Sequence, residues 1–484
     1  MDILETQVVV VGAGAAGLYT AICAARDGAD VTLVSATPLA ESSTYWAQGG
    51  LAAAIGDGDA PELHLADTVA AGRGAVRESA ARVLCEEAPG AVEDLEALGM
   101  RFDTDTSGRL ALGLEGGHSA RRIVHAGGSA TGQRLIRRLG EVVADDARIQ
   151  VLERTRAVAV LAVDGRCHGV ALNDGRRVAG GATVLATGGA SALWSRTTNP
   201  PGAVGGRLVL ALAAGAKLAD LELVQFHPTA VAAANGADGL LVTEAIRGEG
   251  AHLLDASGRR FVDELAPRDE VALAVLHQLR DSGTRAVSLD MREVDPELFP
   301  NVVGALREAG IDPERELVPV APAAHYMMGG IATDLSGRAS LRGLYAVGEC
   351  SCTGLHGANR LASNSLSECF VFGARAARSA ASEPSADRRS ADAPSASAAV
   401  APTPSPSTRA ALWRWAGLER DAEGLSRLMA DPHPLARLVG RCGLARAESR
   451  GAHRRRDFPA VDPTYDAVHV TVAREATTVL ERWS

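Results

Sequence analysis

Near its N-terminus the chain reads Gln7-Val8-Val9-Val10-Val11-Gly12-Ala13-Gly14-Ala15-Ala16-Gly17. The run of valines is typical of a strand buried on both faces in a parallel sheet. A glycine-rich turn follows, and a helical pattern then continues through Arg26. This order of strand, G-x-G-x-x-G and helix is the context that a dinucleotide-binding fold requires, because the glycines let the backbone approach a pyrophosphate at the helix N-terminus.

The second strand of this unit is expected at residues 30–34. In nicotinamide-binding proteins such a strand is followed by an acid that binds the ribose. Here Ser35-Ala36 follows instead. The sequence therefore disfavours a plain nicotinamide enzyme, and it leaves Ser35 as a candidate cofactor contact.

A loop that mixes polar, aromatic and glycine residues comes next, and it reads Ser42-Ser43-Thr44-Tyr45-Trp46-Ala47-Gln48-Gly49-Gly50. It has no regular period, which suits a loop that lies against a flat ring or against phosphates. Exposing two large aromatic side chains together would be costly, so we expect Tyr45 and Trp46 to be covered.

Three further segments predict regular structure around this unit. Residues 75–100 have the apolar spacing of a helix. Residues 149–178 alternate like antiparallel strands, with turns at Asp164-Gly165 and Asn173-Asp174-Gly175. Residues 183–189 form a buried strand that ends in glycines, which gives a second place for close approach of backbone to a ligand.

The stretch 343–366 concentrates candidate ligand contacts. A strand that ends at Gly348 presents Glu349, whose carboxylate can accept hydrogen bonds from sugar or ribityl hydroxyls. Arg360 lies in a loop rich in glycine and asparagine, where its fork can grip a carboxylate. Ser363-Asn364-Ser365-Leu366 predicts a helix start with free N–H groups. The residue types alone leave open an ordinary strand, loop and helix with a surface arginine.

Length and composition limit the class of protein. The chain has 484 residues with 46% hydrophobic content, enough for two or three globular domains. Its net charge of −10 argues against a nucleic-acid partner, and it contains no apolar run long enough to span a membrane. Its seven cysteines include no C-x-x-C pair, so we expect neither a disulfide framework nor a bound metal. We expect a reducing, cytoplasmic location.

Two histidine-containing motifs border a region of different character. It opens at Gln225-Phe226-His227-Pro228-Thr229 and closes at Ala324-His325-Tyr326-Met327-Met328-Gly329-Gly330. Each histidine alone is more often structural than functional, but two at the borders of an inserted domain are well placed to line a cleft. Beyond residue 376 an Ala/Ser/Pro-rich segment predicts a flexible linker, and a helical pattern follows it to the C-terminus.

The ordered set of motifs resembles the succinate dehydrogenase / fumarate reductase flavoprotein family over nearly the whole chain. Beside those quoted above, the matching motifs are L-A-T-G-G at 185–189, T-E-A-x-R-G-E-G at 243–250, A-P-R-D at 266–269 and G-L-H-G-A-N-R-L-A-S-N-S-L at 354–366.

The resemblance implies an α/β, Rossmann-like FAD-binding domain with an inserted α+β capping domain and a C-terminal helical domain. The expected boundaries are 1–220 and 326–376 for the FAD-binding domain, 221–325 for the cap, 377–408 for the linker and 409–484 for the helical domain. The C-terminal domain is shorter than the family pattern implies.

FAD is the cofactor that the resemblance implies. Covalently flavinylated members of the family carry a histidine where this chain has Ser43, so non-covalent binding is expected. The implied contacts are Gly12, Ala13, Gly14, Ala15, Ala16, Gly17, Ser35, Ser43, Thr44, Tyr45, Trp46, Ala47, Gln48, Gly49, Gly50, Glu349, Ser365 and Leu366.

The resemblance also implies a dicarboxylate substrate beneath the cap. Motif positions place the substrate carboxylates near His227, Thr243, His325 and Arg360, and Arg268 matches the family's proton-transferring arginine. In Leu114-Glu115-Gly116-Gly117-His118-Ser119, Glu115 matches the acid by which aspartate-oxidising members face the substrate amino group.

The implied reaction is FAD-dependent oxidation of L-aspartate to iminoaspartate, the first step of bacterial de novo NAD biosynthesis through quinolinate. Oxygen or fumarate would reoxidise the flavin, and the product would pass to quinolinate synthase. Two alternatives are a soluble fumarate reductase or succinate-oxidising flavoprotein, and a flavin-binding homologue with weakened catalysis.

The chain departs from the family at three positions. Gly205-Gly206-Arg207 replaces a G-D-G motif, Ala36 replaces a lysine, and Leu273 stands where an arginine is common. The first departure removes an acid that contacts the cofactor, so weaker FAD binding than in relatives is expected.

Overall fold

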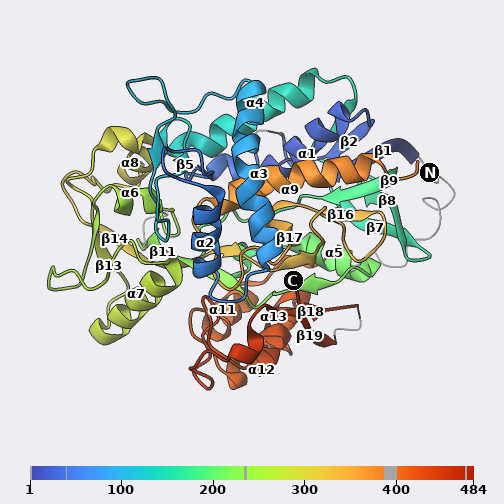
Figure 1. Cartoon of the computed structure of the whole chain (residues 1–484). Coiled ribbons are helices and arrows are strands. Elements are labelled where there is room, and N and C mark those ends of the chain that lie inside the picture. The colour runs from blue at the N-terminus through green and yellow to red at the C-terminus, as the bar shows by residue number, and fades with distance from the viewer. Residues whose placement is uncertain (1–2, 40, 234–236, 386–400, 475–476) are drawn as a thin grey trace.

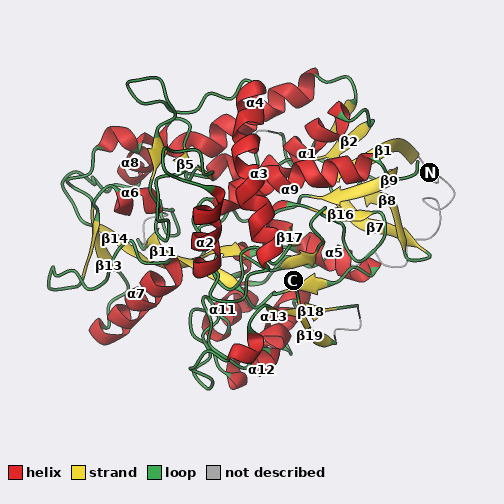
Figure 2. Ribbon diagram, viewed as in Figure 1, coloured by secondary structure: helices red, strands yellow, loops and turns green. Residues whose placement is uncertain are grey.

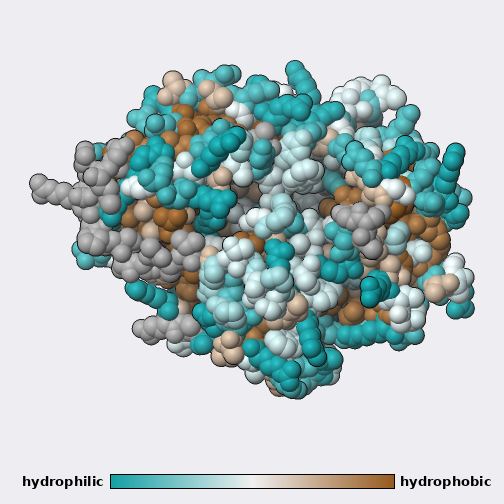
Figure 3. Space-filling model, turned by 180° about the vertical axis from the view of Figure 1, so that it is seen from behind, coloured by the Kyte–Doolittle hydropathy of each residue, from teal (hydrophilic) through white to brown (hydrophobic). Residues whose placement is uncertain are grey.

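The computed structural model describes residues 3–39, 41–233, 237–385, 401–474 and 477–484 (Figure 1). Figures 1 and 2 show a central sheet surrounded by helices, with one domain to its left in this view and the C-terminal domain below it. The opposite side of the molecule is a mosaic of hydrophilic residues with scattered hydrophobic ones (Figure 3). Among the described helices, none is both long enough and apolar enough to cross a membrane.

The predicted FAD-binding region is built on one sheet with the strand order β6-β2-β1-β9-β8-β7, and β16 also pairs with β9. The strands are β1 (Ile3–Val11), β2 (Val31–Val34), β6 (Ile149–Leu152), β7 (Ala157–Val163), β8 (Arg166–Leu172), β9 (Arg177–Leu185) and β16 (Leu344–Ala346). Strands β6, β2, β1, β9 and β16 run parallel, whereas β7 and β8 form an antiparallel meander onto β9. The prediction of antiparallel strands over 149–178 is confirmed for β7 to β9 and is wrong for β6.

Both faces of β1 are buried, as its valines predict. Val8 and Val10 belong to a core with the helices α1 and α9, whereas Val9 and Val11 belong to a second core with Trp194. The helices of this region are α1 (Ala15–Arg26), α2 (Pro61–Ala71), α3 (Glu78–Ala97), α4 (Thr131–Asp145), α5 (Gly206–Ala214) and α9 (Asn364–Ala381). A small sheet of β3 (Leu51–Ala52), β5 (Ile123–Val124) and β4 (Leu112–Gly113) lies in the same region.

The inserted cap contains its own sheet, in the order β11-β14-β13-β12. Its elements are β11 (Val224–Val231), α6 (Glu244–Gly248), β12 (His252–Leu254), α7 (Arg268–Ser282), β13 (Val287–Asp290), α8 (Pro300–Glu308) and β14 (Val318–Met327). A separate core that includes Ile246, Val275 and Val302 holds these elements together. The predicted cap boundaries, 221–325, enclose these elements except for the end of β14.

The C-terminal region combines helices with a hairpin. Its elements are α11 (Pro406–Trp415), α12 (Ala422–Leu428), α13 (Pro434–Ala445), β18 (Val468–Val472) and β19 (Thr478–Arg482). The hairpin extends a sheet of β17 (Ser351–Cys352), β15 (Gly330–Ala332) and β10 (Leu218–Ala219). The helical prediction for 409–484 therefore holds for α11 to α13 but did not include the hairpin.

The predicted linker, 377–408, needs correction at both ends. Helix α9 continues to Ala381, because Ala376, Ala377 and Ala380 pack into the core. Helix α11 begins at Pro406, with the Ser405 hydroxyl accepting a hydrogen bond from the Thr408 N–H at 3.0 Å. Residues 386–400 lie outside the described part of the chain.

Candidate active site

One cavity of about 1070 Å³ runs between the FAD-binding region and the cap. This volume lies slightly above the usual range for ligand sites, which is about 300–1,000 Å³. Of the residues predicted to bind cofactor or substrate, all but Gly17 line it: Gly12, Ala13, Gly14, Ala15, Ala16, Ser35, Ser43, Thr44, Tyr45, Trp46, Ala47, Gln48, Gly49, Gly50, Glu115, His227, Thr243, Arg268, His325, Glu349, Arg360, Ser365 and Leu366. The structure thus brings together side chains from distant parts of the sequence.

Gly17 has a packing role instead. A Cβ atom there would lie 1.9 Å from the Gly12 carbonyl oxygen, so only glycine lets α1 approach the β1 turn. Gly12 itself has a φ of +114°, and its Cβ would lie 2.1 Å from the Ala186 carbonyl oxygen. The turn therefore places the start of α1 directly at the end of the sheet.

The loop that carries Ser43 lies across this turn. The Ala15 N–H donates to Thr44 Oγ1 at 3.2 Å, which ties the loop to the start of α1. Within the same loop, the Ser42 hydroxyl and Gln48 Oε1 are buried without a hydrogen-bond partner. The prediction that both aromatic residues are covered is wrong for Trp46, which is 67% exposed.

The residues at this end fit FAD. The α1 N-terminus suits a pyrophosphate, and the uncompensated Ser42 and Gln48 groups offer hydrogen bonds to a polar ligand. Glu349 faces the cavity from the end of β16, and its Oε1 accepts a hydrogen bond from the Met327 N–H at 3.1 Å. Ser365 lies in the first turn of α9.

Two of the three departures from the family, at Ala36 and at Arg207, line the Ser35 end of the cavity. Arg156 and Arg207 both line it, and the Thr155 N–H donates to the Ser35 carbonyl at 2.9 Å, which places Arg156 beside Ser35. Burial and the charge of Arg156 lower the pKa of Arg207. This end is therefore basic where the family pattern has an acid, which suits a phosphate group.

Two histidines and two arginines converge at the cap end. The rings of His227 on β11 and His325 on β14 are 5.0 Å apart between centroids. Burial, followed by the charge of Arg268, lowers the pKa of both imidazoles well below the usual value, so both are neutral near pH 7. Burial and Arg268 also lower the pKa of Arg360 to about 10, which leaves it charged. The positive charge at this end therefore comes from the arginines, and the imidazoles serve as neutral hydrogen-bonding groups.

A glutamine that the sequence analysis did not single out holds the two arginines in place. Gln225 Oε1 accepts from Arg268 Nη1 at 3.2 Å and from Arg360 Nε at 3.4 Å. Its Nε2 donates to the Asn359 side chain and to the Arg360 carbonyl, both at 2.8 Å. The Arg360 guanidinium also lies 4.8 Å from the centre of the Tyr326 ring.

A second group of residues was quoted in the motifs but not assigned a role. Arg268 Nε donates to Glu244 Oε2 at 2.5 Å, and the other Glu244 oxygen lies 3.2 Å from Arg247. The side chains of Glu244 and Arg247 have no exposed surface. Charged residues this deeply buried are almost always paired. The signal for this pair in the sequence was one acid and one base three positions apart, in the motif T-E-A-x-R-G-E-G.

Glu115 supplies a carboxylate on the side of the FAD-binding region. The residue is 2% exposed, and its Oε2 accepts from the Ser363 hydroxyl at 2.7 Å. Ser363 adopts a φ of +59° immediately before α9, a conformation that few residues other than glycine adopt. Thr243 precedes α6 on the cap side and is 4% exposed.

Known protein families and individual proteins are similar to nearly the whole chain. The model described as "FAD binding domain" matches residues 7–366, and "Fumarate reductase flavoprotein C-term" matches residues 411–481. An L-aspartate oxidase of Caulobacter vibrioides is 46% identical, with 96% of each chain covered. One from Streptomyces coelicolor is 41% identical, covering 97% of this chain and 91% of the relative.

The chain belongs to the L-aspartate oxidase family. Within the wider succinate dehydrogenase / fumarate reductase flavoprotein family, an E. coli quinol fumarate reductase has a TM-score of 0.88 at 28% identity, covering 100% of this chain and 97% of its own. Sdh1 of Mycobacterium smegmatis, in complex with UQ1, has a TM-score of 0.81 at 29% identity, covering 100% of this chain and 95% of its own. The predicted family, fold class and FAD cofactor of this L-aspartate oxidase family member are confirmed.

The state of Glu349 gives a prediction about stability. Burial raises its pKa from 4.5 to about 7, so the folded FAD-free protein retains a proton that the unfolded chain releases. The stabilisation is complete below about pH 4.5 and is lost as pH rises through about 7, a change of about 3 kcal/mol. In denaturant unfolding across this range, the stability of the wild type should fall by about 3 kcal/mol relative to that of Glu349→Gln, because other groups titrate equally in both proteins. Parallel curves would contradict the assigned state of Glu349.

Proposed function

We propose that this chain oxidises L-aspartate to iminoaspartate with non-covalently bound FAD. The observation that carries the proposal is the composition of the cap end of the cavity. Arg268 and Arg360 supply two positive charges, while Glu115 supplies one carboxylate across the same cavity. L-aspartate has the complementary set of groups, two carboxylates and one ammonium.

The FAD-binding end supplies the redox chemistry. FAD, when bound, provides the acceptor for the hydride that leaves the substrate α-carbon. The start of α1 would hold its pyrophosphate, and the loop 42–50, Glu349 and Ser365 would hold the rest of the molecule. Ser43 has no ring nitrogen with which to bond the flavin covalently.

The residues of the cap end orient the substrate. The arginines would bind the carboxylates through charge-assisted hydrogen bonds, and Thr243, His227 and His325 would add neutral ones. Glu115 would accept a hydrogen bond from the ammonium group. Docking of the cap over this end would exclude water, which strengthens each of these interactions and protects the imine product.

Arg268 is poorly suited to act as a base, because a free guanidinium has a pKa of about 12.5 or higher. Its Nε donates a hydrogen bond to Glu244 Oε2, which holds the guanidinium in place. Its role in aspartate oxidation is therefore orientation. When fumarate is the oxidant, Arg268 would donate the proton that fumarate takes up, and the pair Glu244 and Arg247 behind it could resupply that proton.

The wider setting of the reaction is part of the same proposal. The product would enter de novo NAD biosynthesis by passing to quinolinate synthase, and oxygen or fumarate would reoxidise the cofactor. The cytoplasm suits this role, because all seven cysteines of the chain are free thiols. Among the described residues, no group of three or more His, Cys, Asp or Glu side chains is arranged to hold a metal ion.

A panel of four-carbon acids tests the proposal. L-aspartate should bleach the flavin absorbance of the purified protein without air, because the electrons then stay on the cofactor. Succinate should bleach it far more slowly. Rapid bleaching by succinate with none by L-aspartate would instead favour a soluble fumarate reductase or succinate-oxidising flavoprotein, and bleaching by neither would favour a homologue with weakened catalysis.

A further inference from the structure

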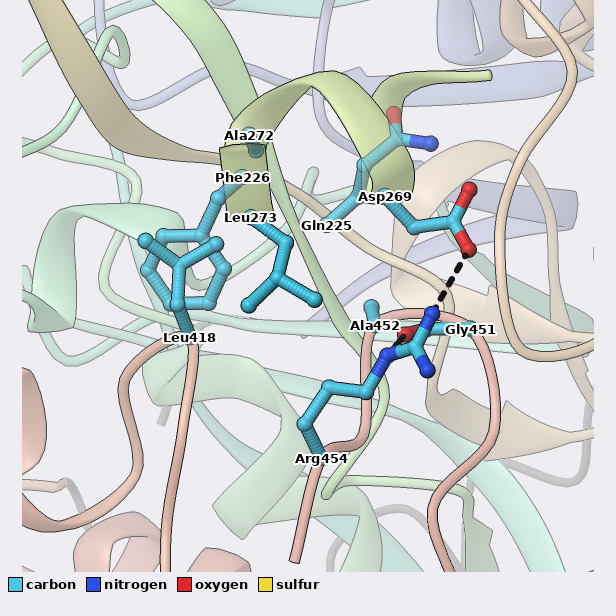
Figure 4. A pocket seen from close by; sticks show the side chains of 9 residues that line it. All are labelled: Gln225, Phe226, Asp269, Ala272, Leu273, Leu418, Gly451, Ala452 and Arg454. Carbon is cyan, nitrogen blue, oxygen red and sulfur yellow. Dashed lines mark hydrogen bonds and ion pairs between the residues drawn. The ribbon is translucent and has the colours of Figure 1, made fainter. Parts of the chain in front are cut away.

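Asp269 is a buried acid at the junction of the three parts of the molecule. It follows Arg268 in the first turn of α7, and its side chain has no exposed surface. Figure 4 shows it above the loop of Gly451 and Ala452, with its carboxylate turned toward Arg454 and away from the neighbouring Leu273. The active-site chemistry described above does not use this carboxylate.

Two arginines from outside the cap bind it. Arg73, in the turn after α2, donates from Nε and Nη2 to the two carboxylate oxygens of Asp269, both at 3.1 Å. Arg454, in the C-terminal region, donates from Nη2 to Asp269 Oδ2 at 3.4 Å. A fork that binds both oxygens fixes the orientation of a carboxylate, not merely its distance. The cap is therefore joined to both other regions at the residue next to Arg268.

The segments that carry these arginines also hold the loop of Arg360. Beside Arg73, the Gly72 carbonyl accepts from the Ala358 N–H at 3.0 Å, and the Ala71 carbonyl accepts from the Asn359 side chain at 3.1 Å. Near Arg454, the Ala452 N–H donates to the Ala358 carbonyl at 2.8 Å. The segment of Arg73 and the segment of Arg454 therefore both form hydrogen bonds with the loop that carries Arg360.

A cap that moved away would break these contacts together. Asp269 and both arginines would then be hydrated, so separation leaves no charge buried without a partner. With the cap docked, in contrast, a carboxylate without surface exposure depends on its partners, and loss of one partner of a buried pair is strongly unfavourable. The contacts therefore favour one docked position of α7 over nearby ones.

We propose that Asp269 is a positioning residue that sets the spacing between Arg268 and Arg360. Its ion pairs with Arg73 and Arg454 fix α7 against the Arg360 loop, so a four-carbon dicarboxylate meets both arginines only when the cap is docked. The inference rests on the proposed function in one respect, namely that the two arginines bind the two carboxylates of one substrate.

The test compares a dicarboxylate with a monocarboxylate in the FAD-loaded protein. In Asp269→Asn, the dissociation constant of succinate, measured by calorimetry, should rise at least tenfold, because succinate must span both arginines. That of butyrate, which has one carboxylate, should change less than threefold. The kcat for L-aspartate should fall at least tenfold while FAD content stays at the wild-type level. A merely structural role would weaken both ligands equally or reduce FAD content.

Glu270→Gln is the matched control. Glu270 lies on the same helix and pairs with the same Arg73, but its side chain is 50% exposed. This variant should keep wild-type binding of both acids. If Asp269→Asn fails to fold, Arg454→Gln, at a side chain that is 31% exposed, should give the same selective loss of succinate binding in weaker form.

Two results would overturn the proposal, namely an unchanged succinate constant in Asp269→Asn or an equal loss for succinate and butyrate. Failure of the proposed function would look different. In that case wild-type protein would bind succinate, and L-aspartate would leave its flavin unbleached.

Discussion

Replacing Arg360 by alanine is expected to lower kcat/KM for L-aspartate by roughly 10²- to 10⁴-fold. The guanidinium is buried at the cap end of the cavity, and it retains its charge although burial lowers its pKa to about 10. Removing one member of a buried charge pair costs about 3–5 kcal/mol, and each 1.36 kcal/mol is tenfold in rate. Steady-state kinetics with L-aspartate would measure the loss.

The lysine variant separates charge from shape. Arg360→Lys keeps a positive charge but cannot reproduce the contacts of the fork with Gln225 and the Ser365 hydroxyl, at 3.4 and 2.9 Å. We expect intermediate activity. Arg338→Ala is the matched control, because this exposed arginine also lies over a tyrosine ring, that of Tyr345 at 6.0 Å, but does not line the cavity. Wild-type turnover in Arg360→Ala would remove this residue from the substrate site.

The cofactor half of the fold was the more predictable part, because its signals are local. The Gly12 turn needs a positive φ, and a Cβ atom there would collide with Ala186, so the residue type itself reports the conformation. The first strand is equally direct, since valines facing both ways indicate two buried faces. Each of these inferences needs only a few consecutive residues.

Pairing between distant segments was less predictable. Residues 149–152 have the same apolar alternation as their neighbours, yet β6 pairs in parallel with β2. Alternation reports which faces are buried and carries no information on strand direction. The C-terminal hairpin left a signal that the helical interpretation passed over, because Val468-His469-Val470-Thr471-Val472 has a period of two.

The substrate half depends on partners that are far apart in the sequence. Gln225 is one polar residue in a strand until Arg268 and Arg360 both reach its Oε1. Trp46 shows the opposite case. Its hydrophobicity predicted a buried side chain, but in the structure it is 67% exposed where it lines the cavity. In both cases the neighbours, and not the residue type, decide the role.

The second large effect is expected for Glu115→Gln, which should lower activity with L-aspartate much more than activity with fumarate. Glutamine has nearly the same shape and can still accept the hydrogen bond from Ser363, which is 2.7 Å long in wild type. It cannot balance the positive charge of a substrate ammonium. A hydrogen bond to a charged group contributes about 1.5–3 kcal/mol, so kcat/KM for L-aspartate should fall roughly 10- to 100-fold.

Fumarate has two carboxylates and no amine, so this change should have almost no effect on the rate of its reduction. We expect fumarate reduction by Glu115→Gln, measured with a chemically reduced dye as electron donor, to stay within about threefold of wild type, because the arginines proposed to bind its carboxylates are unaltered. Ser363→Ala serves as the matched control, since it removes the donor to Glu115 and leaves the carboxylate in place. It should therefore reduce aspartate oxidation less than Glu115→Gln does. Equal losses with L-aspartate and fumarate would show that Glu115 supports the cavity as a whole instead of recognising the amine.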